Sequence, residues 1–250
     1  MKIGILGGTF NPIHLGHLRI AEEARERLGL DQVIFIPAGT PPLKTREIAP
    51  ARHRLRMTRL AVLGNRFFSV LDVECARPDK SFTVHTLELL ARRHAGATLY
   101  FLTGIDAFLD LPLWKDPERL LQLAHFVVLS RPGTRFTDLL GSPYIKSGRM
   151  TLQELDASKR SDAALPLADG HDLLLLRVTD LSVSSTAIRE ALKNSRSVKY
   201  LLPPKVESYI IFNKLYSLMP RATRPGGRCG STNVRPKLEV GVCSKAKTSR

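Results

Sequence analysis

The sequence predicts an α/β protein built on a Rossmann-like, doubly wound parallel sheet. Short runs of continuous apolar residues recur along the chain at strand length, and such runs are typical of strands that are buried on both faces. Amphipathic stretches of helix length alternate with them, which is the order that a parallel sheet requires. With 250 residues, 43% of them hydrophobic, the chain can bury a core as one large domain or two small ones.

The expected elements follow one another in a strand-then-helix order. The apolar runs predict strands at residues 2–6, 33–36, 68–73, 98–102, 126–129 and 173–178. In LGHLRIAEEARERLGL (15–30) the apolar residues are three or four positions apart, which predicts an amphipathic helix capped by Gly29. Further helices are expected at 51–63, 83–94 and 117–123, followed by C-terminal helices at 186–193 and 204–216.

One stretch, residues 134–172, breaks this alternation. It is polar and contains Gly141, Gly148 and Gly170. Because long connections inside a compact domain are usually functional loops, we predict an insertion or a mobile lid there.

The net charge of +15 is unevenly distributed. Residues 219–250 carry eight Lys/Arg and a single acidic residue, Glu239, and they lack apolar periodicity. We therefore predict a folded domain over 1–217 and a basic, disordered tail over 218–250, rather than a dedicated nucleic-acid-binding arm. The remaining positive charge on the body is typical of proteins that bind phosphorylated small molecules.

The sequence predicts a cytoplasmic protein without a membrane-spanning segment. No apolar run approaches the ~20 residues that cross a bilayer, and glycines interrupt the short apolar start, unlike a signal peptide. Cys75, Cys229 and Cys243 share no metal-ligand or redox spacing, so we expect reduced thiols.

The segment GGTFNPIHLGH (7–17) joins the first strand to the first helix. In parallel sheets ligands bind outside the carboxyl ends of the strands, so this segment lies at the expected edge. Its glycines match neither the dinucleotide fingerprint nor a P-loop, but a glycine turn that opens a helix presents free N–H groups to an anion. His17 and Arg19 stand in the first turn without an acidic residue, and a bound phosphate would compensate for cations placed there.

His14 and His17 allow three interpretations. They could bind zinc, although no Cys, Asp or Glu within the motif completes a site. They could be incidental surface residues. The third interpretation is a pair of imidazoles that donate hydrogen bonds to phosphate oxygens and to charge that develops during a reaction.

The segment DLSVSSTAIREAL (180–192) repeats this pattern. Ser184, Ser185 and Thr186 are all good N-cap residues ahead of a helix, and one cap does not require three of them. Arg189 follows in the first turns, where a cation opposes the helix dipole. A structural cap with a surface arginine is one interpretation. The other is that the two helix N-termini bind one triphosphate.

The combination of GGTFNPxHxGH with a downstream SSTxIR resembles the HxGH nucleotidyltransferase superfamily, and within it the bacterial nicotinate-nucleotide adenylyltransferases. The resemblance covers about residues 1–217 and continues through IPAGTPPLK (36–44), HRLRM (53–57), SFTVHTLELL (81–90), TGIDAFLDLPLW (103–114), LSRPG (129–133) and VKYLLPPKVESYI (198–210). Leu43, Gly39 and Phe82 depart from the pattern, in which His, Asn and Tyr are usual.

The resemblance implies transfer of AMP from ATP to nicotinate mononucleotide, which yields deamido-NAD and pyrophosphate without a covalent enzyme intermediate. Mg²⁺ would accompany the ATP phosphates. His14, His17 and Arg189 would be the catalytic residues. ATP would be bound by Gly7, Gly8, Thr9, Phe10, Gly104, Asp106, Ser185 and Thr186, and the mononucleotide by Ala38, Lys44, Thr83, Trp114 and Arg131.

Three alternatives remain at this point. Related adenylyltransferases act on nicotinamide mononucleotide or phosphopantetheine, but Trp114, residues 81–83 and the PAGTPP turn favour the nicotinate acceptor by resemblance. A basic nucleic-acid-binding protein would cluster its cations on a folded face with aromatic residues between them, whereas here the densest basic segment is the tail. We therefore expect neither a nucleic-acid partner nor a membrane partner. A homo-oligomer is compatible with the sequence.

Overall fold

The computed structural model describes residues 1–41, 48–77, 79–167 and 171–216. At its centre is a seven-stranded sheet in the order β3-β2-β1-β4-β5-β7-β6. Neighbouring strands are parallel except for β6, which runs antiparallel to β7 at one edge. The strands are β1 (Lys2–Gly8), β2 (Gln32–Pro37), β3 (Phe68–Val70), β4 (Thr98–Gly104), β5 (His125–Leu129), β6 (Asp162–Pro166) and β7 (Asp172–Leu176).

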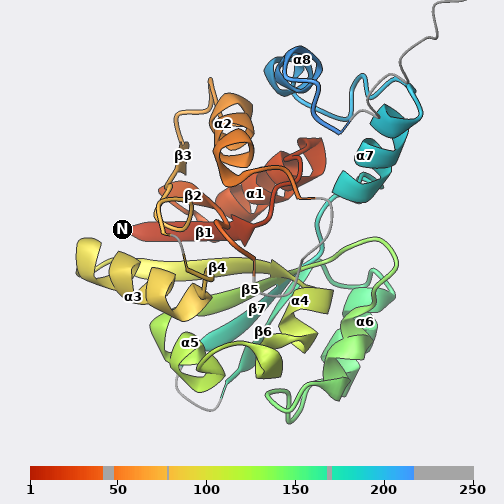
Figure 1. The fold of residues 1–250 in the computed structure, drawn as a ribbon. Coiled ribbons are helices and arrows are strands. Elements are labelled where there is room, and N and C mark those ends of the chain that lie inside the picture. The colour runs from red at the N-terminus through yellow and green to blue at the C-terminus, as the bar shows by residue number, and fades with distance from the viewer. Residues whose placement is uncertain (42–47, 78, 168–170, 217–250) are drawn as a thin grey trace, which may run out of the picture. The chain divides into compact units, whose positions relative to one another are not determined.

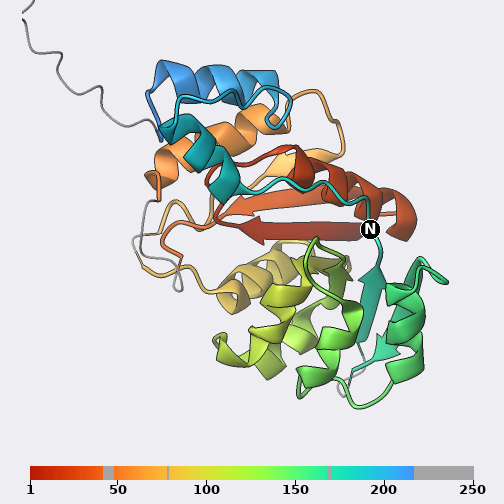
Figure 2. The same cartoon turned by 90° about the vertical axis from the view of Figure 1, so that its right-hand side faces the viewer.

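Helices cover both faces of the sheet (Figures 1 and 2). One face carries α1 (Leu15–Leu28), α2 (Ala51–Ala61), α7 (Ser185–Lys193) and α8 (Pro204–Phe212). The other carries α3 (Thr83–Arg93), α4 (Ile105–Leu109), α5 (Pro117–Leu123) and α6 (Arg149–Asp156). Two short 3-10 helices, η1 (Leu111–Leu113) and η2 (Phe136–Gly141), join the second layer.

The continuous apolar strands arise because both faces are buried. Ile3 and Ile5 of β1 point into the core beneath α3 and α5, whereas Leu6 belongs to the core beneath α1 and α2. In β2 the same alternation separates Ile34 from Phe35. A strand with apolar neighbours on both sides needs apolar residues at every position, which is the pattern the sequence shows.

The predicted alternation of strands and helices is confirmed, with small shifts at the boundaries. The third strand ends at Val70 rather than at 73, and the last helix ends at Phe212 rather than at 216. Gly29 is the predicted C-cap of α1, in the left-handed conformation with φ of 60°. The predicted tail, residues 218–250, lies outside the described residues.

For the part of 134–172 that the structure describes, the prediction of a mobile lid is wrong, whereas the alternative of an insertion stays a prediction. That stretch forms η2, α6 and the edge strand β6, and Leu139, Leu152 and Leu155 are fully buried in the core. The carboxylate of Asp156 accepts hydrogen bonds from the N–H groups of Phe136 and Thr137, which ties η2 to α6. The polar residues that suggested a loop cover an edge of the sheet, and none of them lines the cleft described below.

The strand order changes direction between β1 and β4, since the chain winds outward from β1 to β3 and then returns to start β4 on the other side. The carboxyl ends of β1 and β4 therefore form the crevice in which ligands bind in open α/β sheets. Across the described ranges, no helix has both the length and the apolar character that a membrane span requires.

Candidate active site

A cleft of about 1060 Å³ opens at the carboxyl ends of β1, β4 and β5. Every predicted site residue that the structure describes lines it, from Gly7 at the end of β1 to Arg189 in α7. Lys44 lies outside the described residues. Segments that are far apart in the sequence therefore meet at one place, as the two helix-start motifs predicted.

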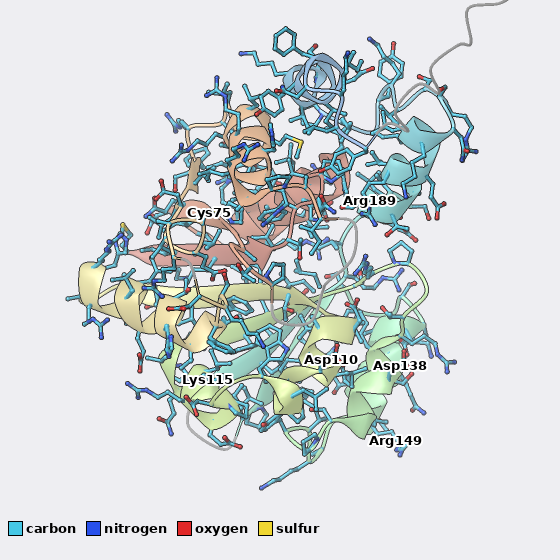
Figure 3. All side chains as sticks on the ribbon, in the orientation of Figure 1. Cys75, Asp110, Lys115, Asp138, Arg149 and Arg189 are labelled. Atoms are coloured by element: carbon cyan, nitrogen blue, oxygen red, sulfur yellow. The ribbon has the colours of Figure 1, made fainter. Side chains whose placement is uncertain are left out.

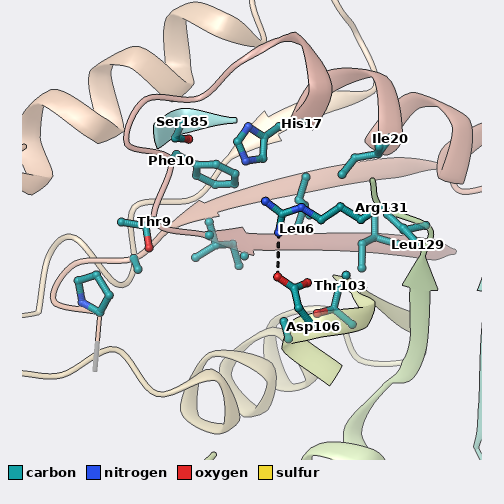
Figure 4. Close-up of a pocket in the computed structure, with 18 of the residues that line it drawn as sticks. Leu6, Thr9, Phe10, His17, Ile20, Thr103, Asp106, Leu129, Arg131 and Ser185 are labelled. Atoms are coloured by element: carbon teal, nitrogen blue, oxygen red, sulfur yellow. Dashed lines mark hydrogen bonds and ion pairs between the residues drawn. The ribbon is translucent and has the colours of Figure 1, made fainter. Parts of the chain in front are cut away.

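The loop after β1 turns sharply beneath the cleft (Figure 4). Phe10 adopts a positive φ of 46° and is 2% exposed, with its ring edge-on to the ring of His17 at 5.2 Å between centroids. A Cβ on Gly8 would lie 2.9 Å from the Phe10 ring. Glycine is needed at position 8 because the Phe10 ring folds back against the end of the strand. The same buried ring packs against His17.

His14 is the N-cap residue of α1 and is almost fully buried, with 6% of its surface exposed. A Cβ on Gly16 would approach its Nδ1 to 3.0 Å, so the glycine of the HxGH motif makes room for this ring. Burial lowers the pKa of His14 to about 4, and the positive charge of Arg131 acts in the same direction. At neutral pH, His14 is therefore an uncharged imidazole.

His17 stands one turn into α1 and stacks on His14, with 3.7 Å between the ring centroids. Its Nδ1 accepts a hydrogen bond from the backbone N–H of His14 at 3.2 Å. A neutral ring in this arrangement carries its proton on Nε2, which makes that atom a donor. As expected, the first turn of α1 contains no acidic residue.

The N-terminus of α7 is fastened to the same loop. Ser184 is the N-cap, with its hydroxyl accepting from the N–H of Ala187, while the Ser185 hydroxyl donates to the Pro12 carbonyl at 2.8 Å. The cap thus needs only Ser184. Ser185 instead holds α7 beside the β1–α1 loop, and the N-termini of α1 and α7 come together as predicted.

Arg189 completes this junction (Figure 3). Its Nη1 donates to the carbonyl of Asn11 at 2.9 Å, and its Nη2 lies 3.4 Å from the Thr186 hydroxyl. Its Nε is buried without a hydrogen-bond partner among the described residues, as is Nδ1 of His14. Buried polar atoms in native proteins almost always have partners, so two such atoms beside one cleft indicate a polar ligand.

Across the cleft, β4 ends at Gly104, the N-cap of α4, and Asp106 stands in the first turn of that helix. The Asp106 carboxylate forms an ion pair with Arg131 at 2.9 Å, and each side chain is about half exposed (Figure 4). A Cβ on Gly104 would lie 2.7 Å from Oδ1 of Asp106. The bare backbone of Gly104 thus allows the carboxylate to fold over the strand end.

Three of the residues expected at the acceptor, Ala38, Thr83 and Trp114, line the cleft together with Arg131. Thr83 begins α3, and Ala38 follows β2, with its N–H donating to the Gly8 carbonyl at 2.9 Å. Trp114 is partly buried and meets Phe101 edge-on at 6.0 Å between ring centroids. Phe82, one of the departures from the family pattern, also lines the cleft. The centroid of its ring lies 5.0 Å from Nζ of Lys115.

Another departure, Gly39, has a physical explanation. A Cβ at this position would lie 2.1 Å from the backbone carbonyl oxygen of Glu74. Because that neighbour is backbone, it cannot move aside as a flexible side chain would. Any larger residue at position 39 therefore requires a different path for the chain around Glu74.

Three residues around the cleft escaped the sequence analysis. Asn11 accepts through its side-chain oxygen from the N–H of Ala49 and the hydroxyl of Tyr216. Glu74 lines the cleft, is largely buried, and accepts from the Thr86 hydroxyl at 2.8 Å. Arg54, also buried, donates hydrogen bonds to the backbone carbonyls of Thr9 and Gly39. No local spacing marks these residues, because their partners come from distant segments.

The described part of the chain contains no group of three or more His, Cys, Asp or Glu side chains that could hold a metal ion. In the same part, Cys75 is a free thiol whose pKa is raised by burial.

The family model described as cytidylyltransferase-like matches residues 5–191. A probable nicotinate-nucleotide adenylyltransferase of Syntrophotalea carbinolica is 44% identical over 225 residues, which cover 89% of this chain and 100% of the relative. That of Geobacter sulfurreducens is 41% identical over 219 residues, covering 87% and 99% of the two chains. The structure of Plasmodium falciparum nicotinic acid mononucleotide adenylyltransferase complexed with NaAD matches in fold, with a TM-score of 0.65, 19% identity and coverage of 86% and 97%.

Proposed function

The chain belongs to the cytidylyltransferase-like family and, within it, to the nicotinate-nucleotide adenylyltransferases, and we propose that it transfers AMP from ATP to nicotinate mononucleotide, a step of NAD biosynthesis. The products are deamido-NAD and pyrophosphate. The observation that carries this proposal is the junction of two helix N-termini at the β1–α1 loop, held by the bonds from Ser185 to Pro12 and from Arg189 to Asn11. Two such N-termini form a site for a polyanion.

The reaction needs positioning and charge stabilisation rather than a protein nucleophile. An oxygen of the acceptor phosphate forms a bond to the α-phosphorus of ATP. The bond from that phosphorus to the oxygen bridging to the β-phosphate breaks, and pyrophosphate leaves with the electron pair. The loop Gly7, Gly8, Thr9 and Phe10 lies under the ATP phosphates, and its backbone bounds the cleft there.

The histidines stabilise the charge on the transferred group. His17 donates from Nε2 to the α-phosphoryl oxygens, and its orientation is set in advance by the bond between its Nδ1 and the N–H of His14. His14 remains neutral and packs against His17, so it adds no positive charge to the loop. Arg189, Ser185 and Thr186 hold the β- and γ-phosphates at the N-terminus of α7.

The opposite wall of the cleft holds the nucleosides. The Asp106 carboxylate accepts hydrogen bonds from the ribose hydroxyls of ATP, and Gly104 allows the ribose to approach the backbone. Trp114 stacks on the nicotinate ring, with Thr83 and the backbone at Ala38 near the nicotinate carboxylate. Lys44 and Arg131 are proposed to bind the mononucleotide phosphate. Arg131 lies between His17 and Asp106, where the two substrates meet (Figure 4).

Magnesium is proposed to accompany ATP rather than to occupy a protein cage. Mg²⁺ usually keeps several waters and binds substrate phosphates rather than a dedicated set of protein ligands. The ion would neutralise charge on the leaving pyrophosphate.

The test is a comparison of acceptors with purified protein, ATP and Mg²⁺, in which pyrophosphate and the dinucleotide product are both measured. Nicotinate mononucleotide should exceed nicotinamide mononucleotide in kcat/KM by about tenfold or more, the factor that corresponds to 1.4 kcal/mol. Phosphopantetheine should not be adenylylated. Equal kcat/KM for the two mononucleotides, or activity with phosphopantetheine alone, would contradict the proposed function.

A further inference from the structure

We propose that Arg54 is a positioning residue for adenylyl transfer: its buried guanidinium sets the separation between the loop beneath ATP and the loop that lines the acceptor. The inference rests on the proposed function. It concerns a residue outside the cleft, on α2, whose contacts reach both substrate loops from behind.

Arg54 is 1% exposed, and among the described residues its guanidinium donates only to backbone carbonyl groups. Its Nη1 donates both to Thr9, in the ATP loop, and to Ala38, in the acceptor loop. Its Nη2 donates to Gly39 at 2.6 Å, and its Nε donates to Ala49 at 2.8 Å. One planar group therefore bridges the two loops and the segment that leads into α2.

The bridge begins where the sheet stops holding the two loops together. The parallel ladder of β1 and β2 ends at the pair Gly8 and Pro37. One further bond follows, from the N–H of Ala38 to the carbonyl of Gly8. Beyond it, Nη1 of Arg54 joins the next carbonyls on both sides. The separation of the loops is thus set by the rigid fork of the guanidinium rather than by strand pairing.

The acceptor loop is held from its other side as well. The N–H of Gly39 donates to the Ser81 hydroxyl at 2.9 Å, and the Glu74 backbone leaves no room for a side chain on Gly39. Gly39 is therefore fixed between Arg54 behind it and Ser81 beside it. Such a loop cannot compensate for a loss of Arg54 by a small shift toward Glu74.

The positive charge of Arg54 argues against a purely structural role, because burying a cation costs free energy. Within the part of the chain that the structure describes, Arg54 forms no ion pair: its hydrogen bonds all go to backbone carbonyls, and the buried Glu74 carboxylate favours its charge without direct contact. A well-packed apolar residue would hold α2 against the sheet without that cost. Only a group with several directed donors can bind carbonyls from both loops at once.

Loop separation matters because in-line attack requires the acceptor oxygen and the α-phosphorus to lie ~3–3.5 Å apart, and a displacement of ~1 Å can lower the rate ~10²-fold. Each substrate meets its own loop, so a change in separation should leave the separate affinities largely intact. The effect should appear in kcat.

The experiment uses Arg54→Lys, which keeps the positive charge and loses the fork. At saturation with both substrates, kcat should fall ~10²-fold, while each KM, and each Kd measured by calorimetry with one substrate at a time, stays within about threefold. The matched control is Met57→Ala, a fully buried position one turn along α2 that packs in the core. It should lower the melting temperature and leave kcat per folded molecule nearly unchanged.

A merely structural Arg54 would behave like the control, with a lower melting temperature and near-normal kcat, and this result would overturn the proposal. A raised KM for one substrate with unchanged kcat would overturn it as well.

Should Arg54→Lys not fold, Ser81→Ala loosens the same loop from its other side and should lower kcat about 2- to 10-fold, the range expected for one hydrogen bond. Unchanged kcat in Ser81→Ala would then refute the role. Failure of the proposed function can be distinguished from failure of the role of Arg54. In that case the unmodified enzyme itself would form no deamido-NAD from ATP and nicotinate mononucleotide.

Discussion

The backbone N–H of His14 donates to Nδ1 of His17 at 3.2 Å, and the two rings stack with 3.7 Å between their centroids. The helix start therefore fixes both the orientation of His17 and the position of its proton. The residue that fixes them is itself buried, with a pKa lowered to about 4. His14 is neutral and supports the ring of His17, and His17 presents its Nε2–H to the cleft.

The lowered pKa of His14 predicts a pH-dependent stability. Between the folded pKa of about 4 and the ordinary value of 6.5, the unfolded chain binds a proton at His14 that the folded chain does not. Stability contributed by the neutral ring is therefore lost as the pH falls through this window. From pH 7 to pH 5 the loss attributable to His14 should be about 2 kcal/mol of unfolding free energy.

Urea unfolding of the unmodified protein and of His14→Asn at both pH values measures this contribution. The variant should lose less stability on acidification than the unmodified protein, because the titrating group is gone. His53 and His125, whose pKa values are also lowered by burial, are present in both proteins and cancel in the difference. Equal losses in the two proteins would show that His14 does not titrate as described.

Asp106→Asn should weaken the binding of ATP without lowering the stability of the fold. A hydrogen bond to a charged group contributes ~1.5–3 kcal/mol, so the KM for ATP should rise ~10- to 100-fold. The ion pair with Arg131 is about half exposed on each side, and exposed pairs contribute little to stability. Initial-rate kinetics over a range of ATP concentrations, together with a melting curve, provides the measurement.

The exposed pair of Arg59 with Asp72 is the matched control, since its separation of 2.8 Å and its exposure are similar and it lies outside the cleft. Asp72→Asn should leave both the KM and the melting temperature unchanged. An equally large rise in KM in this control would remove the case for a ribose contact at Asp106.

Removing residues 219–250 should leave kcat and the melting temperature nearly unchanged. The cleft is lined by residues up to Arg189, and the match to the Syntrophotalea carbinolica relative covers 100% of that relative but 89% of this chain. The shortened and full-length proteins can be compared by pyrophosphate release and by thermal unfolding. A large loss of either would mean that the basic tail completes the fold or the site.

The place of the cut matters, because Tyr216 belongs to the domain. Its hydroxyl donates to the side-chain oxygen of Asn11 at 2.8 Å, and burial raises the pKa of this hydroxyl above its ordinary value. Tyr216→Phe should lower the unfolding free energy by about 1 kcal/mol, as for one hydrogen bond. Denaturant unfolding tests this, and an unchanged midpoint would show that the contact contributes nothing.

The sequence predicted the strands well because burial on both faces leaves a pattern along a single segment. The edge strand β6 left no such pattern: in Asp162–Pro166 only Leu165 is buried. The five-residue helix α4 is too short for helical periodicity to appear. The stretch 134–172, which contains β6, looked like a loop because its buried leucines lie far apart among polar residues.

The site was predictable where chemistry and a helix start coincide in sequence, as at His17 and Arg189. It was not predictable where a contact joins distant segments. The ion pair of Arg131 with Asp106 links the ends of two strands. Nothing near Arg54 distinguishes it from the other arginines of α2, since the carbonyls that bind it come from three other segments.

The most direct test of the account is the steady-state kinetics of His17→Ala. If Nε2–H of His17 binds the α-phosphoryl group more strongly in the transition state than in the ground state, kcat should fall ~10²–10³-fold while the KM for ATP changes much less. The variant should fold and bind ATP. Neither the unmodified protein nor the variant should contain stoichiometric metal. A near-normal kcat, or bound zinc whose removal unfolds the protein, would contradict the assigned role of His17.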